Sequence, residues 1–240
     1  MQLAIDTSTS IVSLALAEEG QILAELTWCS RQNHSVELLP ELGHLLNLVK
    51  VKKEEISQIM VAKGPGSYNG LRVGVSTAKG LAFSLNVPIT GISTLEAHAY
   101  QYAQTGLLVC SLINAGRGEF AAAFYQQKNH RWSTLKREHL ATLESLAQDI
   151  QTKTLFCGEL EQSAISRLKR SLKENFVLPR KASTLRRAAY LVELGQKRLK
   201  AGKGDDPSTL QPLYLRQPHI TRPKRKIEWS PNGNMAKSTD

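Results

Sequence analysis

The sequence predicts an α/β fold of two similar lobes, each with a mixed sheet flanked by helices. Three strand-like apolar runs, followed by alternating helix-like and strand-like runs, occur in the first half of the chain and again in the second. The 240 residues are enough for two domains of roughly 100 residues each. Hydrophobic residues make up 41% and charged residues 22% of the chain, which is typical of a globular protein.

The first lobe is expected to cover residues 1–105. Alternating apolar positions predict strands, and leucines at helical spacing predict a helix after residue 34. Gly20 follows two glutamates and marks a tight turn between the second and third strands. The expected order is strands 3–6, 11–17 and 21–28, helix 35–50, strand 58–62, helix 71–85, strand 88–91 and helix 94–104.

The second lobe is expected to cover residues 106–220 and repeats this order loosely. Its expected segments are strands 107–113, 119–126 and 131–139, helix 143–150, strand 154–157, helix 159–172, strand 175–178 and helix 183–200. The apolar run 213–215 is expected to anchor the Gly- and Pro-rich stretch around it. Residues 221–240 are basic, polar and contain prolines, which predicts a disordered tail.

A Gly-rich stretch at residues 64–74, GPGSYNGLRVG, lies between a predicted strand and a predicted helix. Such a turn can direct free backbone N–H groups at an anion, and Ser67 is a good helix cap. The stretch matches neither a P-loop nor a dinucleotide-binding fingerprint. A tight structural connection is therefore the simpler interpretation.

Charge is distributed unevenly along the chain. Residues 1–120 hold 8 lysines and arginines against 10 aspartates and glutamates, whereas residues 121–240 hold 23 against 11. This asymmetry indicates a phosphate-bearing or acidic partner, or a basic face that is only solvated. Three scattered cysteines, Cys29, Cys110 and Cys157, suggest buried thiols in a reducing compartment. With no membrane-length apolar run and no secretory signal, a cytoplasmic protein is expected.

Several short motifs occur in an order that indicates one family. They are Asp6-Thr7-Ser8, residues 34–40, the Gly-rich stretch, residues 93–97, residues 117–120 and residues 212–216. Over residues 1–220 the chain resembles the TsaB (YeaZ) family, which implies an actin-like ATPase (ASKHA) fold with two RNase-H-like lobes. The chain departs from the family at residues 114–117, where Asn-Ala-Gly-Arg replaces Asp-Ala-Arg-Arg.

The resemblance also implies a supporting role in tRNA modification. TsaB-like chains pair with the paralogous subunit TsaD, which transfers threonylcarbamoyl to N6 of adenosine 37 of tRNA, and the small ATPase TsaE joins them. We therefore expect a non-catalytic subunit of the bacterial t6A machinery that contacts tRNA through the complex and forms a homodimer when TsaD is absent. No cofactor is expected on this chain alone, and ATP is expected only at a composite interface with the partners.

In TsaD one helix holds the metal, and the matching helix of this chain contains a single histidine. TsaD uses two histidines spaced i,i+4, and the matching positions are Thr94 and His98. Because threonine is a poor replacement and no other histidines have ligand spacing, no metal site and no catalytic residue are expected. Two enzyme alternatives remain. One is a stand-alone actin-fold ATPase or small-molecule kinase, which needs Asp6 for nucleotide. The other is a glycoprotease-type metallopeptidase, which Thr94 argues against.

The turn after the first strand is open to two interpretations. In the actin-like fold this turn carries an aspartate that organises metal and phosphate, whereas Asp residues in turns also accept hydrogen bonds from their own backbone. The second interpretation is favoured here. The residues that would form either a nucleotide site or a structural turn are Asp6, Thr7, Ser8, Gly64, Gly66, Ser67, Gly70 and Arg72.

Two helices of the first lobe carry apolar stripes, which face either their own sheet or a partner. In TsaB-like proteins the corresponding helices pair with TsaD or with a second copy, so we expect the same here. Glutamate at position 45 or 78 is expected to abolish pairing and leave the monomer folded. The expected partner-binding residues are Leu38, Leu42, Leu45, Val49, Leu71, Val75, Ala78, Ala82 and Leu85.

Basic residues of the second half are candidate contacts for tRNA phosphates. They are Arg167, Lys169, Arg170, Arg186, Arg187, Lys197 and Arg198, with a further cluster at residues 222–226.

Overall fold

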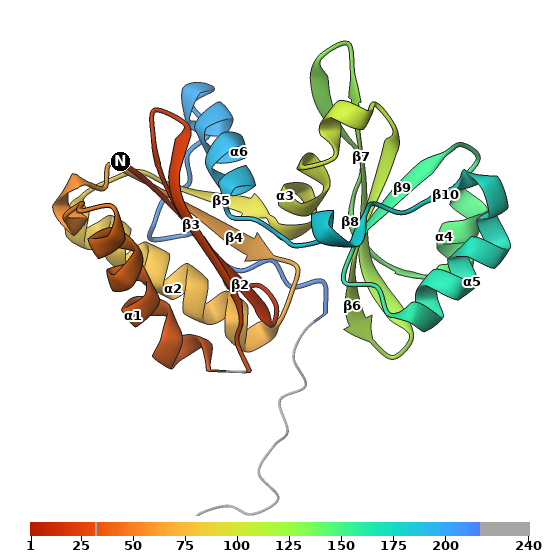
Figure 1. The fold of residues 1–240 in the computed structure, drawn as a ribbon, viewed down its shortest axis with the longest axis horizontal. Helices are drawn as coiled ribbons and strands as arrows, with labels where there is room; N and C mark the ends of the chain where they lie inside the picture. Colours follow the sequence, from red (N-terminus) through yellow and green to blue (C-terminus); the bar gives the residue numbers. More distant parts are fainter. Residues whose placement is uncertain (32, 217–240) are drawn as a thin grey trace, which may run out of the picture.

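The chain forms two lobes side by side, each with its own sheet (Figure 1). The computed structural model describes residues 1–31 and 33–216. The predicted tail at 221–240, with its basic cluster, lies outside the described residues. Within the described ranges, no helix is both long and apolar enough to cross a membrane.

The first lobe is built on a five-stranded mixed sheet. Its strands are β1 (Gln2–Asp6), β2 (Ile11–Glu18), β3 (Gln21–Cys29), β4 (Gln58–Gly64) and β5 (Ile89–Ser93), in the order β3-β2-β1-β4-β5. The first three strands pair antiparallel, and β4 and β5 run parallel to β1. Helices α1 (His34–Leu48) and α2 (Tyr68–Leu85) cover one face, where their leucines and alanines join the core.

The second lobe repeats this topology. Strands β6 (Leu108–Gly116), β7 (Glu119–Lys128), β8 (Arg131–Thr142), β9 (Thr154–Gly158) and β10 (Phe176–Val177) lie in the order β10-β9-β6-β7-β8. Read from β8, this is the order of the first sheet, with the same antiparallel and parallel pairs. Helices α4 (Leu143–Asp149) and α5 (Gln162–Leu172) pack on one face. The duplicated two-lobe prediction is confirmed.

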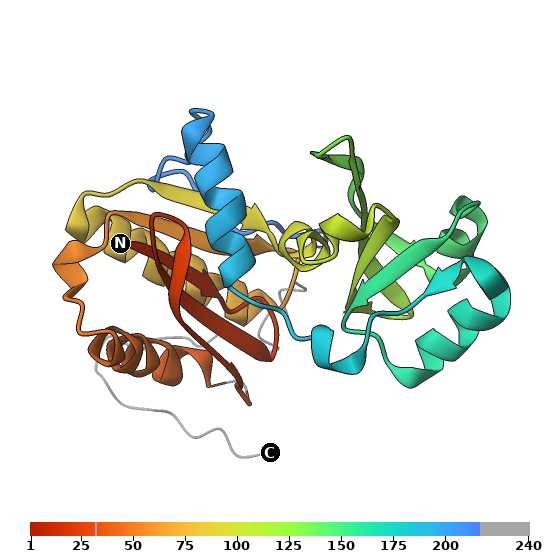
Figure 2. The same ribbon diagram turned by 45° about the horizontal axis from the view of Figure 1, so that its top comes forward.

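Two further helices pack on the sheets near the junction of the lobes. Helix α3 (Thr94–Tyr100) lies at the junction: Ala97 and Tyr100 pack against the first sheet, and Leu95 and Ala99 pack against the second. Helix α6 (Ala189–Lys200) lies over the first sheet, as the two views agree (Figures 1 and 2). The predicted second lobe, residues 106–220, therefore ends too late in the sequence. Helix α6 lies within that range but packs on the sheet of the first lobe.

The segment after α6 also returns to the first lobe. Asp205 pairs with Ile89 at the edge of β5, Leu210 is buried, and the amide of Leu213 donates to the carbonyl of Lys63. The predicted apolar anchor at 213–215 is confirmed, since Leu215 then packs against the second lobe. This last described segment thus bridges the two sheets.

Local differences from the predicted elements have simple causes. Helix α6 begins at Ala189 rather than at residue 183, because residues 181–183 form a separate 3-10 turn. Ser67 is the N-cap of α2, as predicted, and accepts from the Gly70 amide. Of the three cysteines expected to be buried, Cys29 is exposed at the end of β3.

Candidate functional site

The Gly-rich stretch between β4 and α2 packs directly on the turn after β1. A Cβ on Gly66 would lie 2.2 Å from the carbonyl oxygen of Ser8, and one on Gly70 would lie 2.1 Å from the carbonyl oxygen of Thr7. Thr7 Oγ1 donates to the Gly70 carbonyl at 2.7 Å, and the Ser67 amide donates to the Ser8 carbonyl at 2.6 Å. The glycines therefore permit backbone-to-backbone contact between the two turns.

The carboxylate of Asp6 is occupied on one oxygen by its own turn. Oδ1 accepts from the Ser8 amide at 2.9 Å and from the Ser8 hydroxyl at 2.6 Å. Asp6, Thr7 and Ser8 are all buried. This geometry supports the structural-turn interpretation of these residues.

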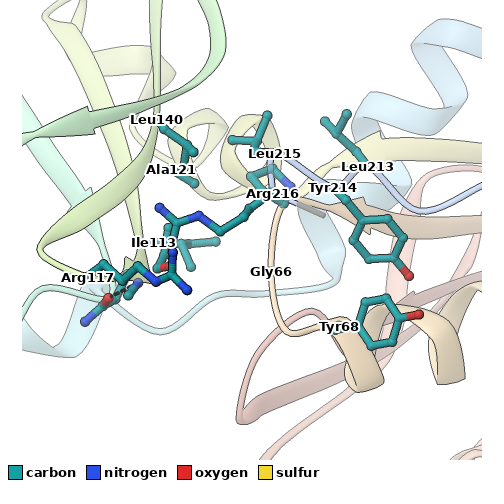
Figure 3. A pocket seen from close by; sticks show the side chains of 14 residues that line it. Gly66, Tyr68, Ile113, Arg117, Ala121, Leu140, Leu213, Tyr214, Leu215 and Arg216 are labelled. Atoms are coloured by element: carbon teal, nitrogen blue, oxygen red, sulfur yellow. Dashed lines mark hydrogen bonds between the residues drawn. The ribbon is translucent and has the colours of Figure 1, made fainter. Parts of the chain in front are cut away.

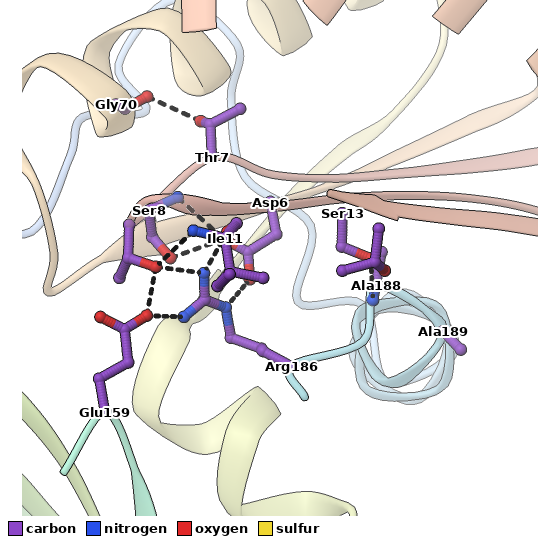
Figure 4. A network of polar contacts seen from close by, with 12 residues as sticks. Asp6, Thr7, Ser8, Ile11, Ser13, Gly70, Glu159, Arg186, Ala188 and Ala189 are labelled. Carbon is purple, nitrogen blue, oxygen red and sulfur yellow. Dashed lines mark hydrogen bonds and ion pairs between the residues drawn. The ribbon is translucent and has the colours of Figure 1, made fainter. Parts of the chain in front are cut away.

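The other oxygen of Asp6 is occupied by Arg186, which is only 3% exposed (Figure 4). Arg186 Nε donates to Asp6 Oδ2 at 2.5 Å. Its Nη2 donates to Thr9 Oγ1 at 2.9 Å and to the Ile11 carbonyl at 2.7 Å, and its Nη1 lies 3.3 Å from Glu159 Oε1. The prediction that Arg186 binds tRNA is wrong, because its guanidinium is enclosed and its donors are used inside the protein.

Glu159 joins this network from the second lobe. It follows β9, and its Oε1 accepts from the Thr9 hydroxyl as well as facing Arg186. We call Asp6, Thr9, Glu159 and Arg186 the inter-lobe polar cluster. Sequence reasoning missed it because Asp6 and Arg186 are 180 residues apart, and no local pattern marks either one as the partner of the other.

The residues at this turn do not fit the metal and nucleotide that the actin-like fold implies. A metal ion or a phosphate at Asp6 would have to displace the Arg186 guanidinium, and Asp6 Oδ1 already accepts two hydrogen bonds. Among residues 1–31 and 33–216, no group of three or more His, Cys, Asp or Glu side chains could hold a metal ion. The structure gives the ATPase or kinase alternative no support at Asp6.

His98 lies beside the inter-lobe polar cluster but makes no bond to it. The side chain is buried, and within the described part of the chain neither ring nitrogen has a hydrogen-bond partner. Burial lowers the pKa of His98 to about 3, with the nearby Arg186 cation acting in the same direction. Thr94, one turn earlier, is also buried. His98 is thus a neutral core histidine, and no second imidazole stands at position 94.

The predicted partner-binding stripes lie mostly in the core of the first lobe. The buried members are Leu38, Leu42, Leu45, Leu71, Val75, Ala78 and Ala82, while Val49 and Leu85 are partly buried against the same cluster. Their spacing reflects packing on their own sheet. The prediction that the buried members form a partner-binding surface is therefore wrong. The apolar side chains that these helices do expose are Val36, Leu39, Leu48 and Phe83.

The other basic candidates are on the surface, but most have acidic or aromatic partners. Arg167 pairs with Glu144, Arg187 with Glu25 and Arg198 with Glu96. Lys197 donates to the hydroxyl of Tyr100 and lies 4.6 Å from the centre of its ring. Lys169 and Arg170 are exposed on α5. Arg72 is stacked at 4.4 Å over the ring of Tyr68.

The fold and this site define a two-lobed protein of the actin-like class, in which an arginine forms an ion pair with the aspartate of the turn after β1. A profile of the family described as "TsaD: tRNA N6-adenosine threonylcarbamoyltransferase" matches residues 22–223. The chain belongs to this family, and within it to the TsaB (YeaZ) group, as its curated relatives and solved neighbours indicate.

Three similar proteins support this placement. The Bacillus subtilis tRNA threonylcarbamoyladenosine biosynthesis protein TsaB is 42% identical over 127 residues, which are 53% of this chain and 56% of that protein. The TsaB of Buchnera aphidicola subsp. Schizaphis graminum is 30% identical over 60% of this chain and 70% of its own length. A crystal structure from Pseudomonas aeruginosa, described as similar to the peptidase YeaZ, superposes with a TM-score of 0.77 at 27% identity. It covers 90% of this chain and 99% of that one.

Proposed function

We propose that this chain is a non-catalytic subunit of bacterial t6A synthesis that supports a TsaD-like transferase, with a TsaE-like ATPase as third subunit. Curated relatives are named for threonylcarbamoyladenosine biosynthesis. The observation that carries the proposal is the state of the two places where an actin-like transferase would do chemistry. Asp6 is paired with Arg186, and His98 is a buried imidazole with Thr94, not a second histidine, one turn earlier on the same helix.

A supporting role requires a docking surface, and the first lobe offers one. Val36 and Leu39 on α1 are 72% and 55% exposed, and Phe83 on α2 is 61% exposed. Large apolar side chains gathered on a helical face are typical of protein–protein contacts. We assign the TsaD-like partner, or a second copy when that partner is absent, to this surface. ATP, if it takes part, then binds at a composite interface rather than at Asp6.

The test is reconstitution of tRNA modification from purified components. Unmodified tRNA is mixed with TsaD, TsaE, the enzyme that makes threonylcarbamoyl-adenylate, threonine, bicarbonate and ATP, and t6A is measured by mass spectrometry. We expect this chain alone to form no t6A and to hydrolyse no ATP. Leaving it out of the full mixture is expected to lower the rate of t6A formation at least tenfold.

Two results would refute the proposal. One is an undiminished rate of modification without this chain. The other is ATP turnover or substrate phosphorylation by the chain alone, which would favour the stand-alone ATPase or kinase. Arg186→Met is the check on the second result. If Asp6 binds the nucleotide, then loss of its ion pair with Arg186 is expected to change the rate of ATP turnover.

A further inference from the structure

Helix α1 presents apolar side chains to solvent in its first two turns. Val36, Leu39 and Pro40 are all exposed, and their i, i+3, i+4 spacing puts them on one side of the helix. The helix itself lies on the outer side of the first lobe in both views (Figures 1 and 2). Apolar side chains gathered in this way are typical of a surface that another segment covers. We call these three residues the α1 face.

The same part of α1 is acidic. Glu37 and Glu41 lie on these turns, and the helix contains no lysine or arginine. Trp28 Nε1 donates to Glu37 Oε2 at 2.8 Å, and this hydrogen bond lowers the pKa of Glu37 below its ordinary value. The helix therefore combines an apolar surface with negative charge, which fits a segment that is both apolar and basic.

The described part of the chain ends close to this face. Tyr214 lies against Tyr68, with ring centres 5.0 Å apart (Figure 3). Two residues after Tyr68, a Cβ on Gly70 would lie 3.5 Å from Nε2 of His34, the first residue of α1. The chain therefore comes near the N-terminal end of α1 two residues before Arg216, its last described residue.

The sequence after the bridging segment, residues 213–216, has the complementary composition. Residues 222–226 contain four lysines and arginines, and Ile227 and Trp229 follow directly. Tryptophan is among the side chains that most often anchor protein contacts. Residues 217–240 can span about 80 Å when extended, whereas the 15 residues of α1 are about 22 Å long. The chain is thus long enough to place these residues on the α1 face.

We propose that residues 222–229 dock on the α1 face of their own chain, with Ile227 and Trp229 on its apolar side chains and the basic residues beside its glutamates. Because the segment is tethered, a contact too weak to hold a free peptide is enough to cover the face. The docked segment then competes with the TsaD-like partner for α1. This competition rests on the proposed function, whereas the docking does not.

The experiment is limited trypsin digestion of the full chain, with cleavage at residues 224–226 followed by mass spectrometry. A protease cuts the undocked segment, so the rate reports the undocked fraction. We expect Leu39→Gln and Trp229→Ser each to raise the cleavage rate about fivefold. The double variant is expected to raise it no further, because each substitution removes the same contact.

Leu135→Gln is the matched control. Leu135 is 57% exposed, against 55% for Leu39, but it lies on β8 of the second lobe. Equal rates in the parent chain, Leu39→Gln and Leu135→Gln would overturn the docking. Multiplied effects in the double variant would also overturn it, because Trp229 would then contact another surface. A parent rate that rises on dilution would do so as well, since it would assign the α1 face to a second copy.

The competition is tested by the affinity of the chain for a purified TsaD-like subunit. If the docked segment covers α1 about four-fifths of the time, Trp229→Ser is expected to bind the subunit about fivefold more tightly than the parent chain. Unchanged affinity together with faster cleavage would overturn the competition. If neither chain binds the subunit, the proposed function is refuted instead, and the trypsin rates still decide the docking.

Discussion

At the residue scale, the neighbouring buried side chains of Arg186 and His98 differ in charge: Arg186 is charged and His98 is neutral. Arg186 has its donors directed at Asp6, Thr9, Ile11 and Glu159, so its charge is retained in the interior. His98 has no hydrogen-bond partner within the described residues and is held neutral by burial. A buried charge is tolerated when it is paired, whereas an unpaired titratable group gives up its charge.

His98 should make the protein acid-sensitive. Its pKa is about 3 when folded, against an ordinary value of 6.5, so the unfolded chain binds this proton first as pH falls. The free energy of unfolding is therefore unaffected by His98 above pH 6.5, and it falls progressively as the pH drops from 6.5 to about 3. At pH 5 the expected loss is about 2 kcal/mol. Urea unfolding at pH 7 and pH 5 should show that His98→Leu loses about 2 kcal/mol less than the parent protein.

The comparison isolates His98 because both proteins carry the same carboxylates. Their absolute stabilities at pH 7 do not enter, since only the change with pH is compared. If the two proteins lose stability equally between pH 7 and pH 5, then His98 is protonated in the folded state and its burial has been misjudged.

At the element scale, α1 has two apolar faces with different roles. Leu45 is 2% exposed and packs on the first sheet, whereas Leu39 on the same helix is 55% exposed. A sequence pattern shows both as leucines at helical spacing, so it cannot tell the inward face from the outward one. This ambiguity explains why the predicted partner-binding residues lie in the core.

Glutamate substitutions should separate these two faces. Leu45→Glu buries a carboxylate among apolar side chains and is expected to destabilise the fold by about 4 kcal/mol or more, so no folded monomer would remain to test. Leu39→Glu is expected to change stability by less than about 0.5 kcal/mol and to abolish co-elution with TsaD in size-exclusion chromatography. Thermal denaturation of both variants is the control. An unchanged complex with Leu39→Glu would exclude this face as the docking surface.

The sequence predicted most strands and helices because their apolar periods are local. It could not predict that α6 returns to the first sheet, since its stripe would pack equally well on either lobe. The Asp6 turn was identified from its motif, and its structural interpretation is supported by the Ser8 bonds. Its partner Arg186 was assigned to tRNA because an arginine's surroundings depend on contacts far away in the chain.

At the scale of the whole molecule, the lobes are tied by elements that cross between them. Helix α3 packs on both sheets, and the bridging segment carries Arg216 to Glu119 in the second lobe. The inter-lobe polar cluster adds a third tie through Glu159, which is the cluster's contribution from the second lobe. Apolar contacts allow two lobes to slide, whereas directed bonds specify one relative position.

Removal of Glu159 should therefore loosen the junction without unfolding either lobe. Glu159→Ala leaves the Thr9 hydroxyl and one Arg186 donor without their acceptor, so we expect the amides of Ser8 and Ile11 to exchange hydrogen about fivefold faster, or about 1 kcal/mol. Both amides are bonded to side chains of the cluster, Asp6 and Thr9. Glu144→Ala is the matched control, because it removes a carboxylate paired with arginine inside the second lobe. Equal exchange in the two variants would mean that α3 and the bridging segment alone fix the lobes, and that Glu159 only lies at their junction.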